Sequence, residues 1–272
     1  MSENDPISME TRIAQACHYL DETTGAVNPA IPLSSTFARD TDYELVGEYS
    51  YGRSGHPGWA LLEKVAAELD GGADALCFSS GMAAICGFFE TVNSGEHVVA
   101  PRIMYHGAQD WLRRISERRG IGLDFFDAAQ IDSLESAVKP GKTTVVWIET
   151  PVNPTWDVID IAAAAEIAHR AGAVLVVDGT VASPVITRAL EFGADLVFHS
   201  ATKYLNGHSD IVAGILVTAR KDDRWSDIQL VRTLTGGILG PMEAWLLLRG
   251  MRTLTLDWRS RSISDVAVLP SA

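Results

Sequence analysis

Short apolar runs alternate with amphipathic stretches from about residue 59 to residue 219, and this alternation limits the possible folds more than any other feature. The runs that resemble buried strands occupy residues 73–80, 96–101, 121–127, 143–150, 173–179, 194–200 and 210–219. Stretches with helical spacing lie between them, at 59–71, 81–92, 107–120, 131–139 and 161–172. Strands that alternate with helices predict an α/β fold, with a mostly parallel sheet covered by helices on both faces. Continuous apolar strands are typical of such sheets, because each strand is buried on both sides.

The two ends of the chain lack this alternation. Residues 1–57 are rich in turn-forming residues and predict an arm without a core of its own. Residues 58–239 hold the alternating elements and predict one large domain. Residues 240–272 start with GPMEAWLLLRGMRTLTLDWRSR, which predicts a long helix at 240–261.

Composition narrows the partners of the chain. A net charge of -13 disfavours nucleic acid and anionic membranes as partners. The three cysteines form no C-x-x-C pair and no disulfide framework. The N-terminal sequence MSENDPISMETR lacks the apolar core of a secretion signal. Together these two observations predict a cytoplasmic protein. The histidines show no metal-ligand spacing and no G-x-G-x-x-G motif occurs, so neither a metal nor a dinucleotide is expected.

Chemically useful side chains follow several of the predicted strands. In an open parallel sheet, ligands bind beyond the carboxyl ends of the strands. Each residue there has a plainer explanation when taken alone: the serines and glycine can form a turn, and most lysines are simply solvated. The residues expected at this edge are Ser80, Gly81, Met82, Tyr105, Asn153, Asp178, Ser200, Thr202 and Lys203.

Together these residues suit pyridoxal phosphate. The Lys203 amine can form a Schiff base with the cofactor aldehyde. The Asp178 carboxylate can keep the ring nitrogen protonated, which makes the ring an electron sink, and the aromatic ring of Tyr105 can stack on its face. Backbone N–H groups at a helix start, together with hydroxyl groups, can bind the phosphate. We therefore expect the cofactor to be pyridoxal 5'-phosphate.

Five motifs carry a family resemblance. They are YGRSGHP at 51–57, SSGMAA at 79–84, TPVNPT at 150–155, VVDGT at 176–180 and SATKYLNGHSD at 200–210. With these motifs the chain resembles the Cys/Met-metabolism family of fold-type-I pyridoxal-phosphate enzymes, from roughly residue 28 to about residue 255. The resemblance implies a transsulfuration enzyme that catalyses γ-replacement or elimination on homoserine-derived or cystathionine-type amino acids. The stretch GGILGPMEAWLLLRGMRTL is most similar to the γ-synthase and γ-lyase members.

The resemblance also implies roles for single residues. Lys203 is expected to form the Schiff base and then to move protons, Asp178 to pair with the pyridinium nitrogen, and Tyr105 to stack on the ring. Asn153 is expected to contact the phenolic oxygen of the cofactor or the substrate. The phosphate is expected to bind Ser80, Gly81, Met82, Ser200 and Thr202, and to receive Tyr51 and Arg53 from a neighbouring subunit, which implies a homodimer or homotetramer.

Three departures from the family pattern concern the substrate. His56 and Gly179 stand where the family has asparagine, which leaves cofactor binding expected and substrate choice open. The family has a smaller C-terminal domain whose arginine binds the substrate carboxylate, and the resemblance fades after about Leu256. Arg249, inside the helix motif, is not expected to replace that arginine. A truncated C-terminal domain is therefore expected, and a cofactor-binding chain with little or no activity is the alternative function.

Overall fold

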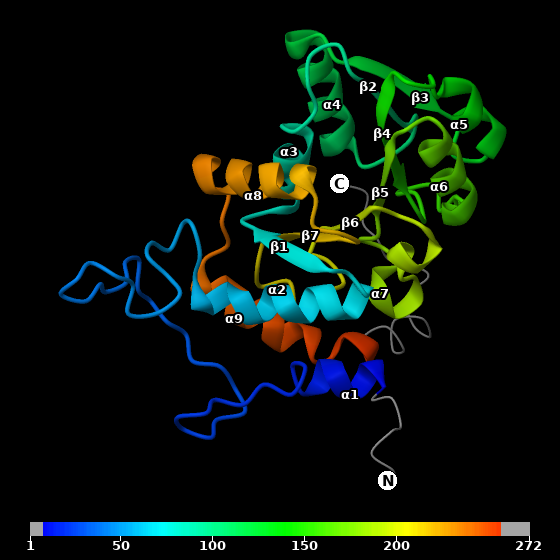
Figure 1. The fold of residues 1–272 in the computed structure, drawn as a ribbon. Coiled ribbons are helices and arrows are strands. Elements are labelled where there is room, and N and C mark those ends of the chain that lie inside the picture. The colour runs from blue at the N-terminus through cyan, green and yellow to red at the C-terminus, as the bar shows by residue number, and fades with distance from the viewer. Residues whose placement is uncertain (1–7, 257–272) are drawn as a thin grey trace.

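The computed structural model describes residues 8–256, and within them the centre is a 7-stranded sheet with the order β1-β7-β6-β5-β4-β2-β3 (Figure 1). Every neighbouring pair is parallel except those of β7, which is antiparallel to both β1 and β6. The predicted, mostly parallel sheet is therefore confirmed. The strands are β1 (Asp74–Phe78), β2 (His97–Pro101), β3 (Gly122–Phe126), β4 (Thr143–Glu149), β5 (Val174–Asp178), β6 (Leu196–His199) and β7 (Gly214–Thr218).

Helices cover both faces of the sheet, because alternate strand residues point to opposite sides. One face packs against α3, α4 and α8 in a cluster that includes Phe88, Trp147 and Phe198. The other face packs against α2 and α9 at one end and against α5 and α6 at the other. The helices are α1 (Met9–Ala14), α2 (Pro57–Asp70), α3 (Gly81–Phe89), α4 (His106–Arg119), α5 (Ile131–Ala137), α6 (Ile161–Arg170), α7 (Ser183–Ile186), α8 (Asp223–Thr235) and α9 (Pro241–Met251), with a 3-10 turn at Ala189–Phe192.

Helix α8 was not predicted from the sequence, and its buried face explains the failure. This face contains Arg232, whose guanidinium carbon lies 4.3 Å from the centre of the Trp59 ring. Arg232 also pairs with Glu63 and donates a hydrogen bond of 3.0 Å to the Cys77 carbonyl. A buried arginine interrupts the apolar pattern that identifies a helix, but its aromatic and hydrogen-bonding partners stabilise it there.

The long helix predicted at 240–261 is shorter in the structure. Helix α9 ends at Met251, where Arg252 caps it, and after a turn at 252–253 residues 254–256 are helical again. The remainder of the predicted helix lies outside the described residues. The start of the predicted arm also differs from expectation, because Ile13 of α1 and Ala16, which follows this helix, are buried in the cluster formed with α2 and α9.

The segment between α1 and α2 loops away from the sheet (Figure 1). Its regular pairing consists of the isolated bridges Thr36–Tyr51 and Arg39–Leu45. Several of its apolar side chains are exposed: Leu20, Val27, Leu33, Tyr43, Val46 and Tyr51. Exposed apolar side chains of this kind suit an interface with another chain. The division into an arm, a large domain and a C-terminal part stays a prediction. At its end His56 accepts a hydrogen bond from the N–H of Gly58 and caps α2, which gives a structural reason for histidine there.

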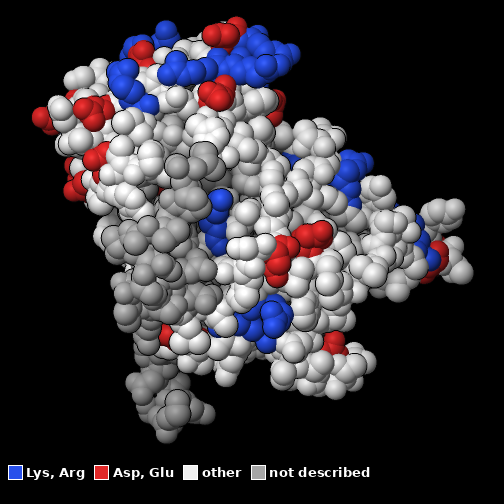
Figure 2. Space-filling view, turned by 180° about the vertical axis from the view of Figure 1, so that it is seen from behind, with Lys and Arg blue, Asp and Glu red and all other residues white. Residues whose placement is uncertain are grey.

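Charged residues of both signs cover the surface. Figure 2 shows Lys and Arg gathered at the top of the molecule, where α4 lies. Helix α4 contains Arg113, Arg114, Arg118 and Arg119, and Arg119 pairs with Glu90 at 3.1 Å. Among the described residues, no helix has the length and apolarity needed to span a membrane.

Candidate functional site

Two carboxylates lie next to each other where β4 and β5 end. Glu149 closes β4 and Asp178 closes β5, and the two residues are paired in register on these parallel strands. Asp178 is in turn in register with Phe198 of β6, so the turn that follows β6 begins at the same sheet edge. Lys203 lies in that turn. The sheet therefore brings the predicted amine and the predicted ring partner to one edge.

The start of α3 and Ser200 form a cradle for an anion. A Cβ atom placed on Gly81 would lie 3.1 Å from Ser200 Oγ, so only glycine lets the helix start approach that hydroxyl so closely. The Ser80 side chain caps α3 by accepting from the N–H of Ala83 at 2.9 Å. Free N–H groups at a helix start favour an anion, and a neighbouring hydroxyl adds a donor. Met82 follows in the same first turn and packs, partly buried, against the apolar cluster beneath.

The turn that carries Lys203 is held by its backbone. The Lys203 N–H donates to the Ser200 carbonyl at 3.0 Å, and the Lys203 carbonyl accepts from Gly207 at 2.9 Å. The Thr202 hydroxyl donates to the carbonyl of Ala213 and accepts from its N–H, at 3.2 and 3.0 Å. Thr202 therefore anchors the turn to the start of β7, and its contact with phosphate stays a prediction. The Lys203 side chain is exposed, and no described residue pairs with its ammonium group.

Glu149 is a site residue that the sequence reasoning missed. Its side chain is 3% exposed, and its two oxygens accept hydrogen bonds from the backbone of Tyr105 at 2.7 Å and of Asn153 at 2.8 Å. One buried carboxylate therefore fixes the backbone of both the predicted stacking residue and the predicted cofactor contact. The available signal was an acidic residue as the last residue of a buried strand, the same signal that identified Asp178.

The electrostatics of the two carboxylates depend on burial. Burial raises the pKa of Asp178, although hydrogen bonds from Thr180 and the charge of His199 oppose the rise. Burial, followed by the charge of Asp178, raises the pKa of Glu149. Two neighbouring buried carboxyls disfavour their ionised forms, and a cation placed beside them would reverse this effect. The site is therefore suited to a positively charged ring nitrogen.

A buried ion pair supports Asp178 from the next strand. His199 Nε2 lies 2.9 Å from Asp70 Oδ2, and both side chains are almost completely buried. Burial lowers the pKa of His199, but the charges of Asp70 and Asp178 outweigh it and the net shift is upward. The raised pKa favours the protonated form of His199, and a protonated His199 favours the ionised form of Asp178. A Cβ atom on Gly179 would lie 3.0 Å from the His199 ring, which explains why a small residue follows the aspartate.

Tyr51 and Arg53 do not join this site within one chain. The Arg53 guanidinium donates to the Thr233 carbonyl at the end of α8, and its carbon lies 5.5 Å from the centre of the Tyr51 ring. Among the described residues, the side-chain contacts of Arg53 are with Tyr51 and α8, Tyr51 also bridges to Thr36, and neither residue contacts Asp178 or Lys203. Their predicted role in a neighbouring subunit stays a prediction.

The residues present fit pyridoxal phosphate. The exposed Lys203 amine suits the aldehyde, the buried Asp178 carboxylate suits the ring nitrogen, and the cradle between Gly81 and Ser200 suits the phosphate. Tyr105, at the start of α4, is 36% exposed, and its ring centre lies 4.9 Å from that of His106. The roles of the individual residues remain predictions derived from this arrangement.

Replacement of Glu149 by Gln is expected to loosen both backbone segments that it holds. An amide offers only one acceptor oxygen, so its NH₂ group would face the N–H of Tyr105 or Asn153. A buried N–H that is left without an acceptor costs about 1–3 kcal/mol, which corresponds to roughly fivefold or more in local opening. Hydrogen exchange of these two amides is the measurement. The surface variant Glu135→Gln, which removes only a pair with Arg170, is the control, and unchanged protection in Glu149→Gln would show that the carboxylate does not hold them.

Comparison with known proteins identifies relatives over nearly the whole chain. The sequence pattern of the family described as Cys/Met metabolism PLP-dependent enzyme matches residues 10–268. Cystathionine gamma-lyase of Bacillus subtilis is 42% identical over 250 residues, which are 90% of this chain and 65% of that protein. Cystathionine gamma-synthase of Mycobacterium bovis is 39% identical over 259 residues, which are 95% of this chain and 66% of that protein.

A solved structure agrees with these sequence relatives. The crystal structure of cystathionine gamma synthase from Xanthomonas oryzae pv. oryzae, in complex with aminoacrylate and cysteine, superposes with a TM-score of 0.87 at 36% identity. The match covers 93% of this chain and 65% of that chain. The chain described here therefore spans just under two thirds of the length of the Bacillus relative and of this structure.

Proposed function

Because the chain belongs to the family of Cys/Met metabolism PLP-dependent enzymes, we propose that it is a transsulfuration enzyme. We infer that it acts by γ-replacement or elimination on homoserine-derived or cystathionine-type amino acids. The observation that carries this proposal is the single sheet edge at which Lys203, Asp178 and the cradle of Gly81 and Ser200 meet. Pyridoxal phosphate is the cofactor of the family, and when bound it supplies an electron sink for charge that develops on the amino-acid substrate.

Lys203 performs the covalent and proton-transfer work in this proposal. Its Nζ would hold the aldehyde of the cofactor, and the amine would move a proton at the substrate Cα. The turn held by Ser200 and Gly207 positions Lys203, and its side chain is exposed. An exposed side chain would leave Nζ free to serve both roles.

The other residues bind and orient the cofactor. Asp178 would hold the proton at the ring nitrogen, and the raised pKa of His199, which pairs with Asp70, favours the ionised form of the Asp178 carboxylate. The N–H groups at the start of α3 and the Ser200 hydroxyl bind the phosphate. Glu149 orients the ring by positioning Tyr105 and Asn153 through their backbones.

The experiment that tests the proposed function is product analysis on the cofactor-loaded protein. O-succinylhomoserine and O-acetylhomoserine, each with and without cysteine, test γ-replacement and elimination, and cystathionine tests cleavage. Formation of cystathionine would identify a synthase, whereas release of cysteine with a keto acid from cystathionine would identify a γ-lyase. Homocysteine with pyruvate would identify β-cleavage. No turnover of any substrate by protein that holds stoichiometric cofactor would contradict the proposal.

The site is proposed to be shared between subunits of a homodimer or homotetramer. Tyr51 and Arg53 lie in the looped-out segment and contact α8 instead of the sheet edge of their own chain. A mixture of Arg53→Ala and Lys203→Ala proteins is therefore expected to recover activity, because a hybrid oligomer contains a site with both native residues. With random exchange into dimers, about a quarter of all sites would be native.

The control for this mixture is exchange of differently tagged wild-type chains, which measures how many hybrids form. A mixture of Lys203→Ala with Lys203→Arg protein should stay inactive, because every site then lacks the lysine. Absence of recovery at proven exchange would place Arg53 in the site of its own subunit or outside the site.

We also propose a cytoplasmic location. Cys17, Cys77 and Cys86 are free thiols. Burial raises the pKa of all three, which keeps them as unreactive thiols. Free and unreactive cysteines are typical of proteins in reducing compartments.

A further inference from the structure

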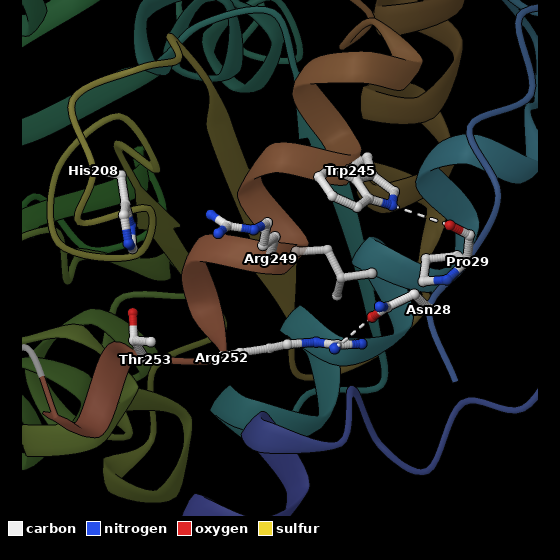
Figure 3. A pocket seen from close by; sticks show the side chains of 8 residues that line it. Asn28, Pro29, His208, Trp245, Arg249, Arg252 and Thr253 are labelled. Carbon is white, nitrogen blue, oxygen red and sulfur yellow. Dashed lines mark hydrogen bonds between the residues drawn. The ribbon is translucent and has the colours of Figure 1, made fainter. Parts of the chain in front are cut away.

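A cavity lies on the exposed side of α9, away from the proposed cofactor residues. It has a volume of about 290 Å³ and lies between the end of α9, the N-terminal segment and the loop that follows Lys203 (Figure 3). We propose that this cavity binds a small organic anion, namely a carboxylate with a short apolar tail. The proposal does not depend on the proposed function. Its lining residues are Asn28, Pro29, His208, Trp245, Leu248, Arg249, Arg252 and Thr253.

The charge of the cavity favours an anion. Arg249 is exposed, and no described residue forms a hydrogen bond or an ion pair with its guanidinium. Figure 3 shows its side chain reaching toward the loop of His208. None of the described residues that line the cavity is acidic, although the whole chain has a net charge of -13. An unpaired guanidinium is the side chain best suited to bind a carboxylate through two parallel hydrogen bonds.

Arg252 is the second arginine that lines the cavity. Its terminal nitrogens donate to Asn28 Oδ1 at 2.6 Å and to the Val27 carbonyl at 3.3 Å, which ties the N-terminal segment to α9. Its Nε is buried and has no hydrogen-bond partner among the described residues. A buried N–H without an acceptor costs about 1–3 kcal/mol. The two donated hydrogen bonds hold Arg252 in the cavity wall, so a second positive charge lies beside the cavity and favours an anion.

The remaining wall of the cavity is apolar, which indicates an organic anion over an inorganic one. The Trp245 indole N–H donates to the Pro29 carbonyl at 3.0 Å, so its polar atom is satisfied and its ring offers an apolar surface. Leu248 and Pro29 continue this surface. A volume of about 290 Å³ lies at the small end of ligand cavities, which suits a molecule with a chain of a few carbons.

The cavity also adjoins the loop of the proposed catalytic lysine. Helix α9 packs tightly on this loop, since a Cβ atom on Gly250 would lie 2.4 Å from the Asn206 carbonyl oxygen. The same carbonyl accepts a hydrogen bond from His208 Nδ1 at 2.6 Å, so the imidazole at the cavity is fixed to the loop. An occupant would therefore touch the loop at His208 while leaving the sheet edge with Asp178 free.

Binding of sodium hexanoate, measured by saturation-transfer NMR on the cofactor-loaded protein, in which the cradle of Gly81 and Ser200 is already filled, tests the proposal. We expect the wild-type protein to bind hexanoate and not hexylammonium, which has the same tail and the opposite charge. Acetate is expected to bind at least about a hundredfold more weakly, because hexanoate has four additional CH₂ groups and each buried CH₂ group contributes about 0.8 kcal/mol. Inorganic phosphate is expected to bind more weakly than hexanoate for the same reason. Equal affinity for acetate and hexanoate, or tighter binding of phosphate, would overturn the assignment to an organic anion.

Variants locate the binding. Arg249→Gln is expected to weaken hexanoate binding about tenfold or more, the loss of one charge-assisted contact, and Arg249→Lys is expected to lose less. Arg249 is exposed and without described partners, so these variants should keep the wild-type unfolding temperature. Arg118→Gln on the exposed face of α4 is the matched control, and Lys203→Ala should bind as the wild type does. Unchanged binding in Arg249→Gln, or loss of binding in Lys203→Ala, would overturn the assignment to this cavity.

Discussion

Borohydride treatment of the protein loaded with pyridoxal phosphate is expected to attach the cofactor permanently to Lys203 and to no other lysine. The Lys203 side chain is exposed at the sheet edge, in a turn next to the anion cradle formed by Gly81 and Ser200. Reduction turns a reversible bond between the amine and the aldehyde into a stable one, so digestion and mass spectrometry can read the labelled residue.

The Lys203→Ala variant is expected to lose this label and nearly all activity. Removal of the proton-transfer group alone costs about 10²–10⁴-fold in rate, and loss of covalent attachment adds to this cost. Lys142→Ala, a change at an exposed lysine far along the chain, is the control and should keep label and activity. A label on another lysine of the wild-type protein, or wild-type turnover by Lys203→Ala, would refute the assignment of Lys203.

The Asp178→Asn variant is expected to keep its fold and its cofactor but to lose about a hundredfold or more in kcat. The amide oxygen of asparagine can still accept the hydrogen bond that Thr180 gives to Asp178 at 3.0 Å, so the local geometry is retained. A neutral amide cannot hold the proton at the ring nitrogen, and the ring then accepts charge from the substrate poorly. Absorbance of the bound cofactor reports binding independently of turnover. Asp223→Asn on the exposed start of α8 is the control.

The Asp178→Asn variant is also expected to change how the affinity for the cofactor depends on pH. Burial raises the pKa of Asp178 in the protein without cofactor, so this carboxyl takes up a proton at a higher pH than an exposed aspartate does. Capture of the cofactor by the wild-type protein is therefore expected to weaken as the pH falls through that raised value. Asp178→Asn has no carboxyl group to titrate at this position, so its cofactor affinity should not show this decrease at low pH. A decrease that persists in the variant would assign the titration to another group.

Much of the fold could be predicted because the relevant signals are local. Most strands of the sheet are nearly continuous apolar runs bounded by turn residues, and burial on both sides requires such a run. The edge strand β3, with Asp124 at its centre, is only partly buried. Helix α2 has helical spacing, a proline at its start and Gly71 at its end, and these signals lie within the helix or next to it. The prediction failed for α8, whose buried Arg232 depends on Trp59 and Cys77, two residues far away in the sequence.

The sequence by itself determined the chemistry of the candidate site. Lys203 among hydroxyl residues, Asp178 at a strand end and Gly81 at a helix start are recognisable because each lies at the end of a buried strand, and parallel strands place such ends at one edge. The family motifs around these residues are also short and continuous. Residue type and local pattern were therefore enough to predict the cofactor before any contact was known.

Only the tertiary structure decided which residues support that chemistry. Glu149 holds Tyr105 and Asn153, and His199 pairs with Asp70, through contacts between segments that are distant along the chain. The cavity around Arg249 likewise forms only where α9 meets the N-terminal segment and the lysine loop. Hydrogen bonds and burial depend on distances in space, and a sequence pattern records only the order of residues along the chain. Buried carboxylates and unpaired cations are thus visible as such only after the chain has folded.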